Sequence, residues 1–296
     1  DLKSGDFIIP FEIDKEFGGI YEPFAFEYGL FSGDGYIDRD YPMVCICGEK
    51  SKLKDLDVKG TWYKEQIKEG YEEPYNRLNL KGVIDLQLSE HLNDKTRGIP
   101  DIIFSWDRES ILEFIAGLIE TDGNLCQQVN TDNYRIFGNE EKIRDLQILL
   151  RRVGINHSTI YCAGEAGEET NFGTRNYTIY CLYIPSYECR DIPTRIKKAI
   201  RIGTRYAINN RHPEGKLIDR ARKQKIIKVE KLNKPQLVYC FTEPLNHMGV
   251  FGNVLTYQCL VETFPSRHDS YDEFQETLKY AYLYSKSVTL VNTHWQ

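Results

Sequence analysis

Apolar residues at helical spacing mark three segments of the chain. Residues 23–33, a segment from about 105 to 121, and residues 140–152 are predicted to be helices. Shorter apolar and β-branched runs are predicted to be strands, and they occur at 36–38, 43–47, 83–88, 134–137, 158–162 and 177–184. The segments 23–104 and 105–210 therefore share one order of helix, strands and helix, which indicates an internal duplication.

The first two predicted helices end in nearly the same residues. The sequences are EYGLFSGDG at 27–35 and IAGLIETDG at 115–123. Gly29 and Gly33 are four residues apart in the first helix, as are Gly117 and Thr121 in the second. Each helix therefore has a stripe of small residues on one face. Such a stripe lets two helix axes approach more closely than the usual distance of about 8 to 10 Å. The two helices are therefore expected to pack against each other.

Each of these helices ends in an Asp-Gly pair, Asp34-Gly35 and Asp122-Gly123. Both glycines are expected to take the left-handed conformation that closes many helices. A carboxylate at a helix C-terminus is disfavoured by the helix dipole, by a few tenths of a kcal/mol or more. Two such carboxylates close together favour a bound cation, and Mg²⁺, which prefers oxygen ligands, is the expected one.

Composition places the chain among folded proteins. Of its 296 residues 41% are hydrophobic and 12% aromatic, enough for two domains or a large one. No apolar run approaches the roughly 20 residues of a membrane span, and no signal-peptide pattern opens the sequence. We therefore expect a cytoplasmic protein with no membrane contact. The eight cysteines lack the spacing of a zinc site and are expected to be reduced thiols.

Charge is unevenly distributed along the chain. Residues 190–234 hold 15 Lys and Arg against four Asp and Glu, a local net charge of +11 in a chain whose total is −6. A basic segment in an acidic chain indicates contact with a polyanion. A solvated helical face followed by a linker would give the same pattern, and the sequence leaves both interpretations open.

The paired motif resembles the LAGLIDADG family of homing endonucleases, in which two such helices pack at a pseudo-two-fold axis. The motif occurs twice, about 90 residues apart, and a further helical segment follows at 142–155. The resemblance implies an α+β fold of two αββαββα halves. It also implies that Asp34 and Asp122 bind Mg²⁺, and that the protein cleaves both strands of a double-stranded DNA target site. Strands of the two halves would read bases in the major groove.

Two further positions follow from this resemblance. Members of the family often carry a lysine before an Ile-Pro pair ahead of the second helix. Here the sequence is Arg97-Gly98-Ile99-Pro100, with Lys95 nearby, so the lysine role is transferred to Arg97. The family motif has a variable acidic position two residues before its final Asp. Ser32 and Glu120 stand at this position here, so only the second motif keeps an acid. Two core helices that end in Asp-Gly, or a LAGLIDADG module that binds DNA or RNA without cleaving it, remain the alternatives.

The C-terminal part resembles the last splicing blocks of an intein. Its junction would be Gln258-Cys259, where the family usually has Asn before Cys, Ser or Thr. The resemblance makes Cys259 the acyl acceptor, Gln258 the side-chain amide that cyclises, and His247 the acid or base. Cys240 stands where Asp is more usual and resembles an internal nucleophile of one intein subclass. A buried thiol at Cys240 and a structural His247 remain open.

The remaining segments complete this interpretation. Residues 1–10 resemble the strand that follows the N-terminal splicing blocks, so a missing N-terminal intein half is an expected partner and splicing within this chain alone is not expected. Residues 259–296 resemble adenosylcobalamin-dependent ribonucleotide reductases, and that cofactor would serve only the intact host enzyme. A reductase fragment is therefore a further alternative for the chain. The expected division is 1–22 and 231–258 for the splicing domain with its β-rich Hint fold, 23–104 and 105–230 for the endonuclease halves, and 259–296 for a short helical host tail.

Overall fold

The computed structural model describes residues 3–8, 18–66, 75–127, 131–170, 173–201, 224–226, 228–230, 248–251, 254–257, 270–273, 275–276 and 279. The chain forms two compact units. One comprises residues 12–217, and the other combines residues 1–11 with 218–296. The first unit contains both Asp-Gly motifs. Of the predicted splicing domain, residues 231–258 and 1–11 fall in the second unit, and residues 12–22 fall in the first. The five-part division expected from the sequence stays a prediction.

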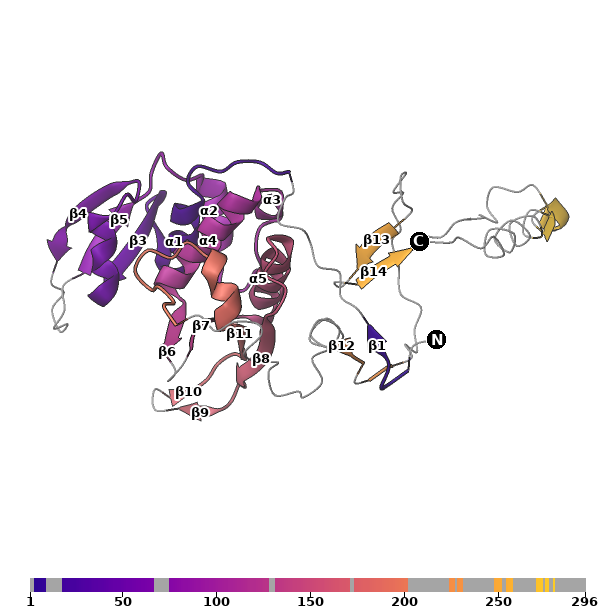
Figure 1. The fold of residues 1–296 in the computed structure, drawn as a ribbon. Helices are drawn as coiled ribbons and strands as arrows, with labels where there is room; N and C mark the ends of the chain where they lie inside the picture. Colours follow the sequence, from indigo (N-terminus) through magenta and orange to yellow (C-terminus); the bar gives the residue numbers. More distant parts are fainter. Residues whose placement is uncertain are drawn as a thin grey trace. The chain divides into compact units, whose positions relative to one another are not determined.

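The centre of the larger unit is a pair of helices, α1 (Ala25–Asp34) and α4 (Arg108–Thr121) (Figure 1). Every residue of α1 before Asp34 is buried. Asp107 caps the start of α4, because its side chain accepts a hydrogen bond from Ser110 N at 2.8 Å. These are two of the helices that apolar spacing predicts, with ends shifted by a few residues.

Each central helix leads into a four-stranded antiparallel sheet. The first sheet contains β2 (Gly35–Asp38), β3 (Tyr41–Cys47), β4 (Thr61–Gln66) and β5 (Tyr75–Asn79), in the order β2-β3-β5-β4. The second contains β6 (Asn124–Gln127), β7 (Asp132–Gly138), β8 (Thr159–Gly164) and β11 (Ile179–Ile184), in the order β6-β7-β11-β8. The two orders are the same when each half is counted from its own helix. The α+β expectation is confirmed, and the two halves share one topology.

Helical segments follow the second and fourth strands of each half. In half 1 these are the 3-10 helix η1 (Gly48–Asp55) and the helix α2 (Leu86–Asn93), with a short helix α3 (Asp101–Phe104) after it. In half 2 they are the helix α5 (Glu140–Arg152) and the 3-10 helix η2 (Ser186–Asp191). Two short strands, β9 (Glu169–Thr170) and β10 (Gly173–Thr174), form a hairpin between β8 and β11.

One predicted strand is wrong. Residues 83–88 do not pair in a sheet, because Asp85 caps α2 and its side chain accepts a hydrogen bond from Leu88 N at 2.8 Å. The apolar run contributes to the core instead, with Ile84 buried. A short apolar run has no period that distinguishes a strand from the start of a helix. Strands β4, β5 and β6 of the two sheets were not predicted.

The left-handed conformation expected for Gly35 and Gly123 is also wrong. Gly35 is extended, with φ −77° and ψ 153°, and Gly123 is not among the residues with positive φ. The lack of room for a side chain explains both glycines better. A Cβ on Gly35 would overlap Phe31 O, and one on Gly123 would lie 2.5 Å from Ile119 Cα. Each glycine thus lets the chain leave its helix close to the preceding turn.

The smaller unit pairs distant parts of the chain. Strand β1 (Phe7–Ile8) pairs antiparallel with β12 (Gln224–Lys225), and two backbone hydrogen bonds of 2.8 Å continue this pairing beside the strands. A hairpin joins β13 (Met248–Phe251) to β14 (Val254–Tyr257). Segments on both sides of the larger unit therefore belong to one structure.

Candidate functional site

The two central helices pack at nearly symmetric contacts. A Cβ on Gly29 would overlap Phe114 O, and a Cβ on Gly117 would overlap Phe26 O. All four residues repeat at an interval of 88, so each helix places its glycine against the same carbonyl of the other. The small-residue stripe inferred from the sequence is therefore the contact surface of the pair.

The same packing brings the acidic ends of the helices together. A Cβ on Gly33 would overlap the Thr121 side chain and lie 3.1 Å from Asp122 N. Gly33 precedes Asp34, so Asp34 and Asp122 lie at adjacent helix ends. The Asp122 residue is exposed, and its carboxylate has no hydrogen bond or ion pair with the described residues. Asp34 is partly exposed, and its Oδ2 lies 2.6 Å from Lys50 Nζ.

Lysine ammonium groups contact the carbonyl oxygens at both helix ends. At the end of α1, Lys95 Nζ donates to Ser32 O at 3.1 Å and to Gly33 O at 2.9 Å. At the end of α4, Lys197 Nζ donates to Ile119 O at 3.0 Å and to Gly123 O at 2.5 Å. Cations stabilise a helix C-terminus. They also add positive charge beside the carboxylates.

A third lysine reaches the end of α1 from the other half. Lys142 is buried, and its Nζ donates to Ser32 O at 3.0 Å. Burial, assisted by the neighbouring Lys95 and opposed by Asp122, lowers the pKa of Lys142 to about 8. Burial also lowers the pKa of Lys197, assisted by Lys50, while Glu120, Asp34 and Asp122 raise it. The lysines and the two Asp residues therefore share one electrostatic environment.

Four lysines form two matched pairs across the pseudo-symmetry. Lys50 is the third residue of η1 and Lys142 the third residue of α5, and both segments follow the second strand of their half. Lys95 follows α2 and Lys197 follows η2, after the fourth strand. The sequence interval from the motif Asp differs between the halves, so sequence spacing alone did not find Lys50, Lys142 and Lys197. Aligning the halves strand by strand would have provided the missing signal.

The variable acidic positions differ in the two halves. Glu120 is buried, and its carboxylate accepts hydrogen bonds from the backbone N–H groups of Arg195, Ile196 and Lys197. It thereby holds the segment that carries the Lys197 ammonium. Ser32 is fully buried, and its Oγ has no hydrogen-bond partner. Glu120 is thus engaged with the backbone of its own half.

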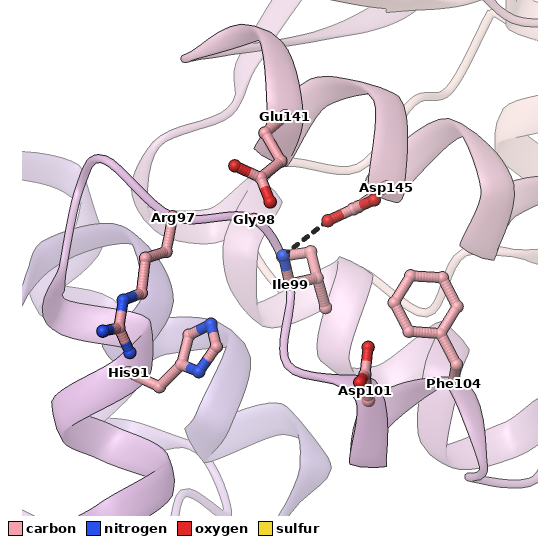
Figure 2. Close-up of a pocket in the computed structure, with 8 residues that line it drawn as sticks. All are labelled: His91, Arg97, Gly98, Ile99, Asp101, Phe104, Glu141 and Asp145. Carbon is pink, nitrogen blue, oxygen red and sulfur yellow. Dashed lines mark hydrogen bonds between the residues drawn. The ribbon is translucent and has the colours of Figure 1, made fainter. Parts of the chain in front are cut away.

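Arg97 does not reach the helix ends. Its guanidinium pairs with Asp94, with 3.1 Å between Nε and Oδ2, and the side chain is 60% exposed. It lines an open cavity of about 640 Å³ instead (Figure 2). Lys95, two residues earlier, does reach the end of α1. The role assigned to Arg97 stays a prediction without a supporting contact.

The splicing residues Cys240, His247, Gln258 and Cys259 lie outside the described residues. Their expected roles stay predictions. Of the basic segment at 190–234, the described part up to residue 201 is partly held by acids of the same unit. Arg195 pairs with Glu113 at 3.3 Å, and Asp132, which is buried, pairs with Arg201 at 2.8 Å. This part forms no α-helix, so the helical-face interpretation does not apply to it.

The donor atoms at the two helix ends suit a hard cation. Mg²⁺ typically uses one or two carboxylates and keeps water or phosphate at its other positions. Asp34 and Asp122 supply two carboxylates, and Asp122 is exposed to ligands from outside. No group of three or more His, Cys, Asp or Glu side chains suited to a metal occurs in the described part of the chain. Two carboxylates would leave the other positions of such an ion to water or further oxygen ligands.

The outer face of each sheet presents an arginine among tyrosines. In half 1, Arg77 lies opposite Cys45 on β3 and stacks over Tyr63, with 5.5 Å between its Cζ and the ring centroid. In half 2, Arg135 lies opposite Tyr183. The Nε atoms of both arginines have no hydrogen-bond partner among the described residues. Each sheet thus offers a cation beside aromatic groups on the side away from the core.

Known proteins resemble parts of this chain. No protein-family profile matches it. The chain is 25% identical, over 270 residues, to the ribonucleoside-diphosphate reductase large subunit of Invertebrate iridescent virus 6, a match of 88% of this chain and 26% of that protein. Over 37 residues, 12% of the chain, it is 60% identical to a probable adenosylcobalamin-dependent ribonucleoside-triphosphate reductase of Dictyostelium discoideum, of which the match covers 5%. The chain thus spans about a quarter of the first relative.

Solved structures with LAGLIDADG domains are also similar. The N-terminal LAGLIDADG domain of DUF199/WhiA matches with a TM-score of 0.38 and 16% identity, over 62% of this chain and 88% of that one. The homing endonuclease I-WcaI bound to its DNA recognition sequence matches with a TM-score of 0.34 and 12% identity, over 57% and 78%. No helix among the described residues is long and apolar enough to cross a membrane.

Proposed function

We propose that the larger unit is a site-specific endonuclease that cleaves both strands of duplex DNA. The observation that carries this proposal is the placement of Asp34 and Asp122 at adjacent ends of two tightly packed helices, surrounded by lysines. Cleavage of a phosphodiester needs groups that hold a cation and groups that offset the charge of a phosphate. This part of the unit supplies both kinds.

The residues divide these tasks. Asp34 and Asp122 would hold Mg²⁺, which when bound activates water and stabilises the charge on the scissile phosphate. Lys50 keeps a positive charge 2.6 Å from Asp34 Oδ2 and would offset the charge of a phosphate there. Lys95 and Lys197 hold the helix ends through their carbonyl oxygens, so the two Asp backbones are fixed before DNA binds. A fixed arrangement of charge is the main source of electrostatic catalysis.

The outer faces of the two sheets would bind the DNA. Arg77 and Arg135 are placed to donate to guanine edges or to phosphates. Tyr63 and Tyr183 stand beside them with further polar groups. Because the side chains of the two halves differ, the proposed target site is not palindromic.

The endonuclease proposal is tested by cleavage of duplex DNA with Mg²⁺. Suitable substrates are uninterrupted reductase coding DNA around the codon of Cys259 and a plasmid library with randomised inserts. We expect Asp34→Asn and Asp122→Asn each to lower cleavage by at least about a hundredfold, and Asp55→Asn, an exposed acid at the end of η1, to leave it unchanged. Unaltered cleavage by both site variants would contradict the proposal. DNA binding without cleavage by the wild type would support the binding-module alternative.

We also propose that the smaller unit is a protein-splicing segment of an intein. The observation in its favour is the pairing of β1 with β12, which places the larger unit as an insertion between two parts of one structure. The junction residues follow the β13–β14 hairpin closely in sequence. The Gln258 amide nitrogen would attack its own backbone carbonyl, closing a ring and releasing the amino group of Cys259. Before this step the Cys259 thiolate would accept the upstream acyl group and displace the nucleophile of the N-terminal half that carried it. After release, an S-to-N shift onto the freed Cys259 amino group would form the new peptide bond.

This second proposal is tested at the Gln258–Cys259 bond. Incubation of the chain with a complementary N-terminal intein half should give a ligated product, in which the upstream host segment is joined to Cys259, and a released intein peptide that ends in the cyclised Gln258. Gln258→Ala should leave the upstream bond reactive but prevent release of that peptide. Mass spectrometry distinguishes these products. Absence of both products, with a partner half that is active toward another C-terminal half, would contradict the splicing role.

We further propose that residues 259–296 belong to a ribonucleotide reductase host. The segment has 38 residues, and short matches of 37 and 38 residues connect the chain to adenosylcobalamin-dependent reductases. In the spliced host Cys259 would then be a redox cysteine. Host activity, with its cobalamin cofactor, would require the joined protein.

A further inference from the structure

We propose that Asn139 and Asp145, at the start and middle of α5, are positioning residues that hold residues 95–99 and thereby place the Lys95 ammonium at the end of α1. This segment, here named the strap, connects α2 to α3. Helix α5 belongs to the other half. The inference rests on the proposed endonuclease function, and it adds a requirement that one half organises the site of the other.

The first contact is between Asp145 and the end of the strap. Asp145 Oδ2 accepts a hydrogen bond from Ile99 N at 2.8 Å (Figure 2). A Cβ on Gly98 would overlap the same oxygen. The strap backbone therefore lies directly against the carboxylate, and a side chain at residue 98 would require Asp145 to move.

The second contact is made by Asn139, which performs two tasks with one side chain. Its Oδ1 accepts a hydrogen bond from Lys142 N at 2.8 Å and caps α5. Its Nδ2 donates to Lys95 O at 2.7 Å and to Arg97 O at 3.1 Å. Lys95, whose side chain enters the site, is therefore held by Asn139 through its own backbone carbonyl.

The strap has little packing on its outer side. The cavity of about 640 Å³ beside it is open and is lined by charged side chains, including Arg97, Asp101 and Glu141 (Figure 2). Ile99, in contrast, is buried and anchors only the end of the strap. The strap backbone is held locally by Asp94, which accepts hydrogen bonds from Thr96 N and Arg97 N. The described hydrogen bonds to the strap from the other half are those of Asn139 and Asp145.

These contacts matter because the strap carries Lys95, whose side chain reaches the end of α1. Lys95 Nζ donates to Ser32 O and Gly33 O, and Lys142 of α5 donates to Ser32 O as well. One face of α5 thus contacts the end of α1 directly through Lys142 and indirectly through Lys95. Two ammonium groups at one carbonyl repel each other, and the contacts of the strap with Asn139 and Asp145 oppose that repulsion.

The test compares Asp145→Ala with Asp145→Asn and with Glu141→Ala. We expect Asp145→Ala to lower DNA cleavage by about tenfold, as loss of one well-placed hydrogen bond permits. Asp145→Asn keeps an oxygen acceptor and should restore most of the activity. Glu141→Ala removes a carboxylate from the same helix and cavity that makes no described bond to the strap, and it should cleave at the wild-type rate. Equal loss in all three variants would contradict the proposal.

A double-mutant cycle shows whether the effect passes through Lys95. Once Lys95→Ala has removed the ammonium group, adding Asp145→Ala should change cleavage by less than about twofold, because the two changes act on one contact. Asn139→Ser, which keeps a capping oxygen but loses the two strap bonds, should behave like Asp145→Ala. Full additivity of either change with Lys95→Ala would overturn the inference.

A second measurement does not depend on cleavage. Reductive methylation followed by mass spectrometry reports the accessibility of each lysine. We expect Lys95 to be modified at least about threefold faster in Asp145→Ala than in the wild type, because its ammonium group leaves the carbonyls, while exposed Lys54 is unchanged. If the wild type cleaves no DNA but Lys95 is released, the strap is correct and the endonuclease proposal fails. Unchanged Lys95 reactivity contradicts the strap itself.

Discussion

At the scale of single residues, the site depends on cations whose partners are mainly backbone carbonyls. Lys95, Lys142 and Lys197 each donate to the last turn of α1 or α4. Such contacts use positive charge to stabilise helix ends without neutralising the motif carboxylates. Asp122 consequently keeps an unpaired carboxylate among the described residues. Charge is retained at the position where a metal ion and a phosphate are proposed to bind.

Lys142 makes the stability of the larger unit depend on pH. Burial, and then Lys95, lower its folded pKa from 10.5 to about 8. Between these values the unfolded chain binds this proton and the folded chain does not, so the free energy of unfolding contributed by Lys142 rises with pH across that interval. Below pH 8 the buried charge costs up to about 3 kcal/mol.

We therefore expect Lys142→Met to have a higher free energy of unfolding than the wild type at pH 7. Loss of the hydrogen bond to Ser32 O offsets part of this gain. The advantage should shrink as the pH rises from 8 to 10.5. Urea unfolding at several pH values measures the difference, with Lys54→Met as the exposed control. A difference that stays constant with pH would show that Lys142 does not titrate in this range.

At the scale of elements, the two motif helices act as a single packed pair. Their glycines meet backbone atoms of the facing helix, so the stripe leaves no room for a methyl group. Close backbone approach also sets how near Asp34 and Asp122 lie. Packing and site geometry are therefore determined by the same residues.

Gly117→Ala is expected to destabilise the larger unit by about 1 to 3 kcal/mol, because its Cβ would overlap Phe26 O on a rigid helix. The control is Gly138→Ala, where the closest atom to the added Cβ is Ile143 Cγ1 at 3.5 Å. Thermal unfolding compares the two variants with the wild type. Equal unfolding temperatures for Gly117→Ala and the wild type would mean that the helix pair accommodates the added methyl group without loss of stability, which would contradict the prediction.

At the scale of the whole molecule, one unit is inserted within the other. Residues 1–11 and 218–296 form a unit through the β1–β12 pairing, although the larger unit separates them in sequence. An insertion of this kind allows the two proposed functions to be changed independently. The endonuclease and splicing residues then lie in different units.

Replacement of residues 12–217 by a short Gly-Ser linker is expected to abolish DNA cleavage and to retain reaction at the Gln258–Cys259 bond. The reason is that neither β1 nor β12 belongs to the deleted unit. Mass spectrometry of the product, with the complementary intein half present, measures the reaction. Loss of the reaction in the deleted form, while Asp34→Asn retains it, would show that the splicing segment needs the larger unit.

The sequence predicted some parts of the fold and site better than others. Helices α1, α4 and α5 were predicted because their apolar residues recur with a helical period and their sides face one core. The strand at 83–88 was wrong because Asp85 formed a cap, and β4 was missed because its residues alternate weakly in a partly exposed strand. Lys95 was considered only as a neighbour of Arg97, because adjacent sequence positions give no information about which side chain turns inward.

The sequence by itself determined that two similar helices each end in Asp-Gly and that small residues permit their close packing. These are local properties, since they depend on residue size, period and order along the chain. Only the tertiary structure decided which cations surround the two Asp residues, because Lys50, Lys95, Lys142 and Lys197 come from four separate segments. It also decided that β1 pairs with β12. Contacts between distant segments depend on how sheets and helices pack, and a single sequence does not specify that arrangement residue by residue.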